Sequence, residues 1–347
     1  MPPVRVLIVD DSTTMRALFT TILEEAPGIT VIDHAANAEE ARRLIARDYP
    51  DVVTLDVEMP GTSGLELLRE VMAERPLPII MLSSLTQKGS AATLEALELG
   101  AYDCFPKPRA ATMEEFRKIG PRLAKLVKAA AAAGKAVNAK AASGEVLVGS
   151  DYMPGDGVIV LVGNTGGVEI VSAIVNRLPA NCPPVIVHLG DAHNVADALV
   201  EKLDKSARPA VRAAYDGVPL ERGNVYVLRE ATRHAVVDRW PDAAIRLIDG
   251  EPIAGHRPSA NLLLQSIAKT AGGRAAVGML SGIGDDGVAL LGALRGAGAP
   301  TLAVLPDEAK ARELPEQAAM IGGATPRSLE DLGRALLMHG AAAAMAA

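Results

Sequence analysis

The sequence predicts an α/β protein with two domains, each built around a parallel sheet. Short apolar, β-branched runs alternate with segments whose apolar residues recur at helical spacing. This alternation is broken once, by an Ala- and Lys-rich stretch over residues 109–150. A chain of 347 residues is also long enough for about two domains. We therefore expect a first domain over residues 1–108, with a closing helix to about 132, and a second domain over 151–347.

The composition excludes several classes of protein. Hydrophobic residues make up 49% of the chain and charged residues 22%, as is typical of a globular protein with a large core. The net charge of −7 and the pI near 5.5 give no basic surface for nucleic acid. The isolated Cys104 and Cys182 favour a reducing compartment and argue against a zinc site. Because no signal sequence and no apolar run of about 18 residues is found, we expect a cytoplasmic protein without membrane insertion.

The first domain begins with a strand and an amphipathic helix. Residues 6–9 are continuously apolar, which is typical of a strand covered on both faces of a parallel sheet. The apolar residues that follow recur at helical spacing, so we expect a helix from near Ser12 that stops at Pro27. Further buried strands are expected over 52–55 and 79–82, and a short one before Lys107.

Polar residues stand where these strands end. Asp10 and Asp11 follow the first strand, Asp56 the second and Ser83 the third, and Lys107 follows the last. Ligands of open parallel sheets bind at the carboxyl ends of the strands. Each residue alone could serve as a helix cap, but together they indicate a site for Mg²⁺ and a phosphoryl group. Clustered carboxylates need a cation, and the lysine and the serine hydroxyl can bind the phosphoryl oxygens.

The stretch between the domains has two parts. Residues 113–132 keep helical spacing, and we expect this helix to be interrupted or capped at Pro121. Residues 133–150 lack apolar spacing, so they are expected to form a flexible linker.

The second domain places three chemically informative residues near strand ends. Asn164 lies in the Gly-rich turn after the apolar run 158–162, where a strand-to-helix hydrolase presents its nucleophile. His188 ends the apolar run 185–188, and Asp286 lies in a Gly-rich loop before an expected helix. A serine at 164 could lose its proton to the histidine, but an amide cannot. We therefore favour an N-cap role for Asn164, while the turn by itself is also compatible with nucleotide binding.

Residues 1–108 resemble a two-component receiver domain, which has a flavodoxin-like fold. The resemblance implies that Asp56 accepts the phosphoryl group and that Asp10 and Asp11 bind the metal together with the backbone carbonyl of Glu58. It also implies that Ser83 is the switch hydroxyl and Lys107 the phosphate partner. One departure is Cys104, which stands where receivers usually carry an aromatic residue.

The whole chain resembles the chemotaxis response regulators of the protein-glutamate methylesterase family, the CheB type. The resemblance is carried by segments 56–60, 81–86, 165–167, 256–259 and 282–287. It implies a Rossmann-like, doubly wound second domain with a Ser, His, Asp triad at Asn164, His188 and Asp286. Besides Asn164, two departures lie near this site. Ile283 replaces the usual loop methionine, and residues 189–190 are Leu-Gly where Met-Pro is usual.

These observations predict a response regulator with an intact phosphorylation site and a second domain that has lost its nucleophile and acts by binding. The family resemblance implies a chemotaxis-type histidine kinase and a methyl-accepting chemoreceptor as partners. One alternative is an active methylesterase or glutamine deamidase that uses Thr165 or a water molecule activated by His188. Another is a domain that binds a nucleotide or another anion at the Gly-rich turn.

Overall fold

The chain forms two compact units, Met1–Asn138 and Ala139–Ala347. The computed structural model describes residues 2–83, 87–108, 110–133, 146–149, 152–190 and 195–339. Most of the expected linker, residues 134–145 and 150, lies outside this part of the chain. No helix within the described residues is long and apolar enough to cross a membrane.

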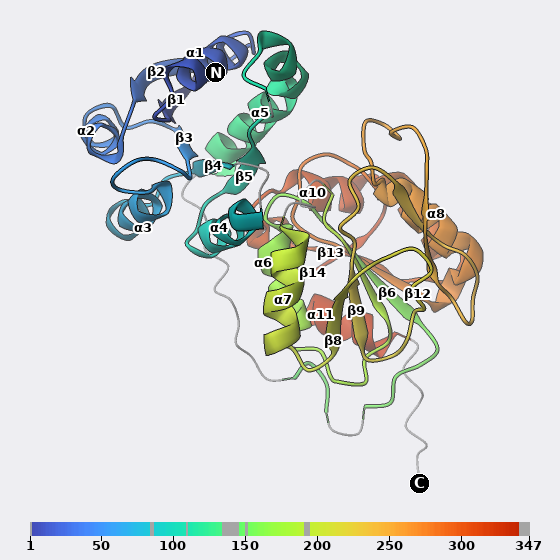
Figure 1. The fold of residues 1–347 in the computed structure, drawn as a ribbon. Helices are drawn as coiled ribbons and strands as arrows, with labels where there is room; N and C mark the ends of the chain where they lie inside the picture. Colours follow the sequence, from blue (N-terminus) through green and yellow to red (C-terminus); the bar gives the residue numbers. More distant parts are fainter. Residues whose placement is uncertain are drawn as a thin grey trace. The chain divides into compact units, whose positions relative to one another are not determined.

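The first unit is a five-stranded parallel sheet with helices packed on it (Figure 1). Its strands are β1 (Val4–Val9), β2 (Ile29–Ala35), β3 (Val52–Asp56), β4 (Ile79–Ser83) and β5 (Asp103–Pro106). Its helices are α1 (Thr13–Glu24), α2 (Ala38–Asp48), α3 (Gly64–Glu74), α4 (Gln87–Glu98) and α5 (Met113–Ala133). The sheet order is β2-β1-β3-β4-β5. Because the chain order reverses beside β1, the carboxyl ends of β1 and β3 flank a ligand-binding crevice.

Helix α1 agrees with the sequence prediction. Ser12 is its N-cap, and the Ser12 side chain accepts a hydrogen bond from the Met15 N–H at 3.4 Å. The helix ends at Glu24, just before Pro27. Its buried face packs against α5, where the rings of Phe19 and Phe116 meet edge to face with centroids 4.8 Å apart.

The prediction of a break at Pro121 was wrong, because α5 continues through this residue. A proline ring clashes with the Cβ of the preceding residue in a helix. Here that residue is Gly120, which has no Cβ and lies against Ile22 of α1. The buried residues on both sides of Pro121, including Phe116 and Leu123, hold the two halves against the same surface.

The second unit is a seven-stranded parallel sheet with an added antiparallel hairpin (Figure 1). Its sheet strands are β6 (Val158–Val162), β7 (Val185–His188), β8 (Ala210–Ala213), β9 (Asn224–Val227), β12 (Ala275–Met279), β13 (Thr301–Val304) and β14 (Thr325–Arg327). The hairpin consists of β10 (His234–Val237) and β11 (Ile245–Ile248). The helices are α6 (Gly167–Val175), α7 (Ala196–Ser206), α8 (Ala260–Thr270), α9 (Val288–Gly296), α10 (Glu313–Met320) and α11 (Leu329–Met338), with short 3₁₀ turns η2 (Gly272–Arg274) and η3 (Pro306–Glu308).

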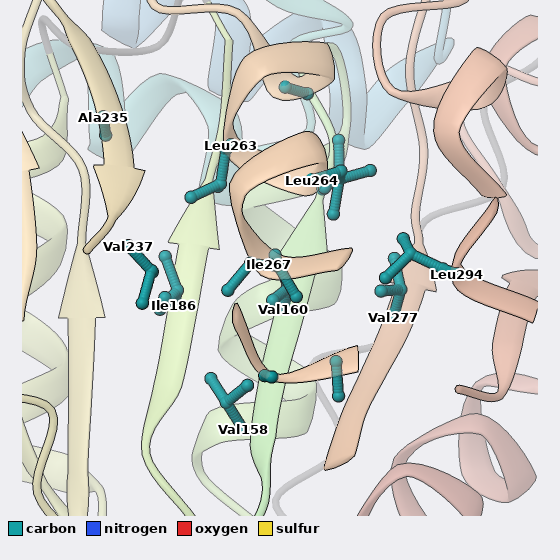
Figure 2. Packing of buried hydrophobic residues seen from close by; sticks show 14 of the residues in the cluster. Val158, Val160, Ile186, Ala235, Val237, Leu263, Leu264, Ile267, Val277 and Leu294 are labelled. Atoms are coloured by element: carbon teal, nitrogen blue, oxygen red, sulfur yellow. The ribbon is translucent and has the colours of Figure 1, made fainter. Parts of the chain in front are cut away.

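A large apolar core joins this sheet to α8, α9 and the hairpin. Figure 2 shows Leu263 and Ile267 of α8 in this core, together with Val160 of β6, Ile186 of β7 and Val277 of β12. All five side chains are fully buried. Burial of this kind contributes about 1.5–3 kcal/mol for each large aliphatic side chain, so the strands that carry the candidate site are held rigidly.

The strand order of the second unit, β14-β13-β12-β6-β7-β9-β8, is doubly wound. From β6 the chain moves outward through β7, and it later returns on the other side at β12. The switch point therefore lies between β6 and β12, where ligands of open α/β sheets bind. The loops that follow these two strands carry Asn164 and Asp286.

Candidate functional site

Three carboxylates meet at the carboxyl ends of β1 and β3 in the first unit. Oxygens of Asp10, Asp11 and Asp56 all lie within 4.8 Å of one another. Asp10 and Asp56 are buried, whereas Asp11 is exposed. The Lys107 Nζ lies 2.8 Å from Oδ2 of Asp10 and 2.7 Å from Oδ2 of Asp56. One ammonium cannot balance three carboxylates, so this donor set fits a divalent cation.

The charges in this cluster perturb each other. Burial raises the pKa of Asp56 to about 6, although the hydrogen bond from Lys107 opposes this rise. Burial lowers the pKa of Lys107, but the hydrogen bonds to Asp10 and Asp56 more than offset it, so the net pKa is raised. Lys107 is therefore a fixed positive charge beside Asp56.

Ser83 and Glu58 also lie at this edge of the sheet. The Lys107 N–H donates to the Ser83 carbonyl at 2.8 Å, which holds the ends of β4 and β5 together. The Ser83 hydroxyl is buried and has no hydrogen-bond partner among the described residues. The Glu58 N–H donates to Oδ1 of Asp56 at 3.2 Å. All the residues predicted for the phosphorylation site are thus neighbours in the fold.

Arg16 also supports this cluster, although no sequence pattern singled it out. Its guanidinium donates to the carbonyls of Asp10 and Asp11 at 2.6 and 3.1 Å, which fixes the loop between β1 and α1. Its position one turn into an amphipathic helix carries no distinctive signal. Segment 84–86, which was part of the family resemblance, lies outside the described residues.

Asn164 lies at the switch point of the second unit and joins two loops. Its Oδ1 accepts hydrogen bonds from the N–H groups of Thr165 and Ile283, both at 2.7 Å. Its Nδ2 donates to the Ile283 carbonyl at 3.0 Å. The Asn164 carboxamide is therefore one of the links between the loop after β6 and the loop after β12.

The expected N-cap role of Asn164 was wrong. Helix α6 begins at Gly167, and its N-cap is Gly166, which has no side chain to cap the helix. The side-chain oxygen of Asn164 does not reach the amides of the first helical turn, because Thr165 and Ile283 already donate to it. The backbone carbonyl of Asn164 instead accepts from the Gly167 N–H at 2.7 Å.

Two glycines enclose the Asn164 side chain. A Cβ atom at Gly282 would lie 2.7 Å from Oδ1 of Asn164, so a larger residue would displace the carboxamide. A Cβ atom at Gly190 would lie 3.2 Å from Cβ of Asn164. Gly190 also has a φ of 50°, in the left-handed region that proline cannot adopt. The Leu-Gly sequence at 189–190 therefore gives a backbone here that the Met-Pro of the family pattern could not.

His188 ends β7 and is buried. Its Nδ1 accepts a hydrogen bond from the Gly190 N–H at 3.2 Å, and its Nε2 has no partner among the described residues. Burial lowers the pKa of His188, and this effect outweighs the attraction of the nearby Asp286 carboxylate. The imidazole is therefore neutral at pH 7.

Asp286 binds the start of α8. One carboxylate oxygen accepts from the Ser259 hydroxyl and the Asn261 N–H, both at 3.0 Å, and the other accepts from the Ala260 N–H at 2.7 Å. An anion is favoured at a helix N-terminus. Within the described part of the chain, none of its hydrogen bonds goes to His188. The structure thus brings Asn164, His188 and Asp286 to one edge of the sheet without joining them by hydrogen bonds.

Two residues to which the sequence assigned no role, His234 and Ser259, form a buried polar group near Asp286. The Ser259 N–H donates to Nδ1 of His234 at 3.2 Å, and Nε2 of His234 lies 3.0 Å from the Glu251 carbonyl. His234 is therefore a structural histidine. Ser259 belongs to the family-like segment 256–259, but only the fold shows that its hydroxyl faces Asp286.

The two units together define a class: a response regulator whose receiver unit is joined to a hydrolase-type α/β domain. The chain belongs to the CheB methylesterase family. The family model described as CheB methylesterase matches residues 159–336, and the model described as response regulator receiver domain matches residues 6–117.

Several relatives are similar over most of the chain. A protein-glutamate methylesterase/protein-glutamine glutaminase of Rhizobium etli is 42% identical over 86% of this chain and 86% of its own. Relatives with the same activity in their names are 39% identical in Caulobacter vibrioides, over 97% of this chain and 98% of that one, and 35% identical in Salmonella typhimurium, over 93% of both. The crystal structure of the Thermotoga maritima CheB methylesterase catalytic domain matches with a TM-score of 0.50 and 21% identity, covering 52% of this chain and 97% of that one. This likeness shows a shared fold.

Proposed function

We propose that this protein is a chemotaxis response regulator that is phosphorylated on Asp56 and whose methylesterase-type domain acts by binding rather than by hydrolysis. The observation that carries this proposal is the Asn164 carboxamide, which stands at the nucleophile position implied by the family resemblance. An amide has no hydroxyl that a histidine could deprotonate. A chemotaxis-type histidine kinase and a methyl-accepting chemoreceptor are the partners that the family implies.

In the first unit, the Asp56 carboxylate would attack the phosphorus atom of a phosphohistidine on the kinase. An oxygen–phosphorus bond forms, the nitrogen–phosphorus bond breaks, and the histidine leaves with the electron pair. Lys107, already 2.7 Å from Asp56, would pair with the charge of the phosphoryl group. The buried Ser83 hydroxyl would donate a hydrogen bond to it. Asp10, Asp11, Asp56 and the Glu58 carbonyl would hold Mg²⁺, which supplies charge neutralisation.

In the second unit, His188 and Asp286 also support a loss of hydrolysis. A general base in a triad carries its proton on Nδ1 and directs Nε2 at the nucleophile. The Nδ1 of His188 instead accepts the Gly190 N–H. The Asp286 carboxylate instead accepts hydrogen bonds from Ser259 and the N-terminus of α8. Loss of a triad nucleophile lowers turnover by about 10⁶-fold in a well-studied protease, so residual activity would be too slow for receptor adaptation.

An active methylesterase or glutamine deamidase is the second candidate function. It is favoured by the names of the relatives at 35–42% identity, all of which are protein-glutamate methylesterases. Such an enzyme would need the Thr165 hydroxyl as nucleophile, or a water molecule deprotonated by His188.

Methanol release from a methylated chemoreceptor distinguishes the two candidates. The assay should use the full chain, with and without a small phosphodonor and Mg²⁺, because phosphorylation can control the second unit. We expect no release above that of the His188→Ala variant in either state. Release that requires His188 would establish the active enzyme and overturn the proposal. Its loss in Thr165→Val would then assign the nucleophile to Thr165, and its persistence there would assign it to a water molecule.

A further inference from the structure

Two backbone N–H groups at the switch point converge on one oxygen atom. The Thr165 N–H comes from the loop after β6, and the Ile283 N–H comes from the loop after β12. Both lie 2.7 Å from Oδ1 of Asn164. Two amides from separate loops that share a single acceptor form a preorganised binding position for an oxygen that carries negative charge.

The two amides stand at the chain positions that form an oxyanion hole in related hydrolase folds. In hydrolases with a nucleophile on a strand-to-helix turn, the oxyanion hole uses the N–H of the residue after the nucleophile and a second N–H from another loop. Thr165 directly follows position 164, and Ile283 supplies the second amide from a separate loop. Here the acceptor is the chain's own carboxamide oxygen.

We propose that Asn164 fills, with its own side chain, a carboxylate-binding pocket formed by the N–H groups of Thr165 and Ile283. The inference builds on the proposed function, because it adds a second reason for the absence of hydrolysis. A substrate carbonyl cannot accept from these amides while Asn164 does, even if a water molecule were activated nearby.

The surroundings of Asn164 hold the carboxamide in this pocket. Its Nδ2 donates to the Ile283 carbonyl, so both polar atoms of the side chain are engaged by the same two loops. The absence of a Cβ at Gly282 and Gly190 leaves room for the Asn164 side chain. A shorter, non-polar residue at 164 would leave the two N–H groups unsatisfied in a mostly buried site, which favours entry of an anion.

The chemical class that fits the vacated pocket is a small carboxylate. A carboxylate oxygen is a stronger acceptor than an amide oxygen, because hydrogen bonds to ionised acceptors are stronger. The pocket also precedes the N-terminus of the nine-residue helix α6, whose dipole favours an anion. Formate is the smallest such probe, and it occupies about the same space as the carboxamide group.

The test is a titration of the full chain with sodium formate at constant ionic strength, followed through the backbone amide signals of Thr165 and Ile283 by NMR. In Asn164→Ala we expect both signals to shift saturably. In the wild type, formate should bind at least about tenfold more weakly, a difference of about 1.4 kcal/mol. The Asn164→Asp variant is the matched control, because its carboxylate refills the pocket and should also prevent the shifts.

Two outcomes would overturn the inference: a folded Asn164→Ala chain whose two amide signals do not respond to formate, or a wild-type chain that responds equally. If Asn164→Ala does not fold, Asn164→Ser takes its place, since serine is too short to reach both amides. The proposed function is judged separately, by wild-type methanol release. Methanol release together with formate binding only in Asn164→Ala would overturn the proposed function and leave the pocket assignment intact.

Discussion

The Gly190 N–H donates a hydrogen bond to Nδ1 of His188 across 3.2 Å. A ring nitrogen that accepts a hydrogen bond carries no proton, so the neutral imidazole must be protonated on Nε2. This tautomer is the reverse of the one that a triad requires. The family resemblance leads us to expect proline at this position, and proline has no N–H to donate. Gly190 therefore changes both the backbone beside Asn164 and the proton position on His188.

We predict that His188 populates the Nε2–H tautomer in the wild-type chain. Nitrogen-15 NMR of the imidazole rings separates the two tautomers by the shifts of Nδ1 and Nε2. His234 provides an internal comparison, because its Nδ1 also accepts a backbone N–H, here from Ser259. A protonated Nδ1 on His188 at neutral pH would contradict this prediction and would restore His188 as a candidate base.

The tautomer leads to a prediction about rescue. Asn164→Ser supplies a hydroxyl and empties the pocket of Thr165 and Ile283, so methanol release should rise above the wild-type level. Methanol release by this variant should nevertheless stay far below that of an intact triad, because Gly190 still donates to Nδ1 of His188 and Asp286 is bound to the start of α8. The matched control is Asn164→Ser combined with His188→Ala, which should return release to background. Full activity in Asn164→Ser alone would show that the other departures from the family pattern do not matter.

Much of the fold was predictable, because it follows from local pattern. Buried parallel strands are continuous apolar runs, and the strands β1, β3, β4, β6 and β7 were all found from them. The doubly wound order was implied by the family resemblance rather than by the runs themselves. The continuous helix at Pro121 was missed, because the preceding Gly120 has no Cβ for the proline ring to clash with, and because the burial of residues on both sides of Pro121 is visible only in the fold.

The sequence predicted where in the fold the candidate site residues lie, but it did not predict all of their hydrogen-bond partners. Strand ends placed Asp10, Asp56 and Lys107 at one edge, and the ion pairs among them follow from that geometry. The preference of asparagine for helix N-caps predicted that the Asn164 side chain binds the first turn of α6, which was wrong. The amides that bind its side chain belong in part to a loop 119 residues further along the chain, which no local signal reveals. Likewise, Asp286 was expected beside an imidazole, whereas the N-terminus of α8 takes its hydrogen bonds.

We expect Asp56→Asn to abolish labelling by a small phosphodonor in the presence of Mg²⁺, because the amide oxygen is a poor nucleophile. Asp51→Asn is the matched control. Asp51 is exposed beyond the other end of β3, and it accepts the Arg5 N–H through a side-chain oxygen that asparagine keeps. Labelling of the Asp51→Asn variant should equal that of the wild type. The label should be acid-stable and base-labile, and its persistence in Asp56→Asn would assign the phosphorylation to another residue.

The two thiols should differ in reactivity. Burial raises the pKa of Cys182 to about 12, so almost no thiolate exists at pH 8. Cys104 is only partly buried and lies in β5, the strand at one edge of the first unit's sheet. A chromogenic disulfide reagent should therefore titrate one thiol in the native chain and two after denaturation. The Cys104→Ser variant should show none in the native state, and rapid labelling of Cys182 in that variant would contradict its burial.

Stability should depend on pH through His188. Its pKa is lowered in the folded chain by burial, whereas the unfolded chain has a pKa of about 6.5. Above that pH both states are neutral and His188 adds no pH dependence. Below that pH the imidazole of the unfolded chain is protonated while that of the folded chain stays neutral. The free energy of unfolding therefore falls by up to about 1.4 kcal/mol per pH unit until the folded pKa is reached.

Urea unfolding of the second unit between pH 7.5 and 5 measures this slope, with His188→Gln as the control because it removes the titrating group. Equal slopes in the wild type and His188→Gln would show that the histidine is free to protonate in the folded chain.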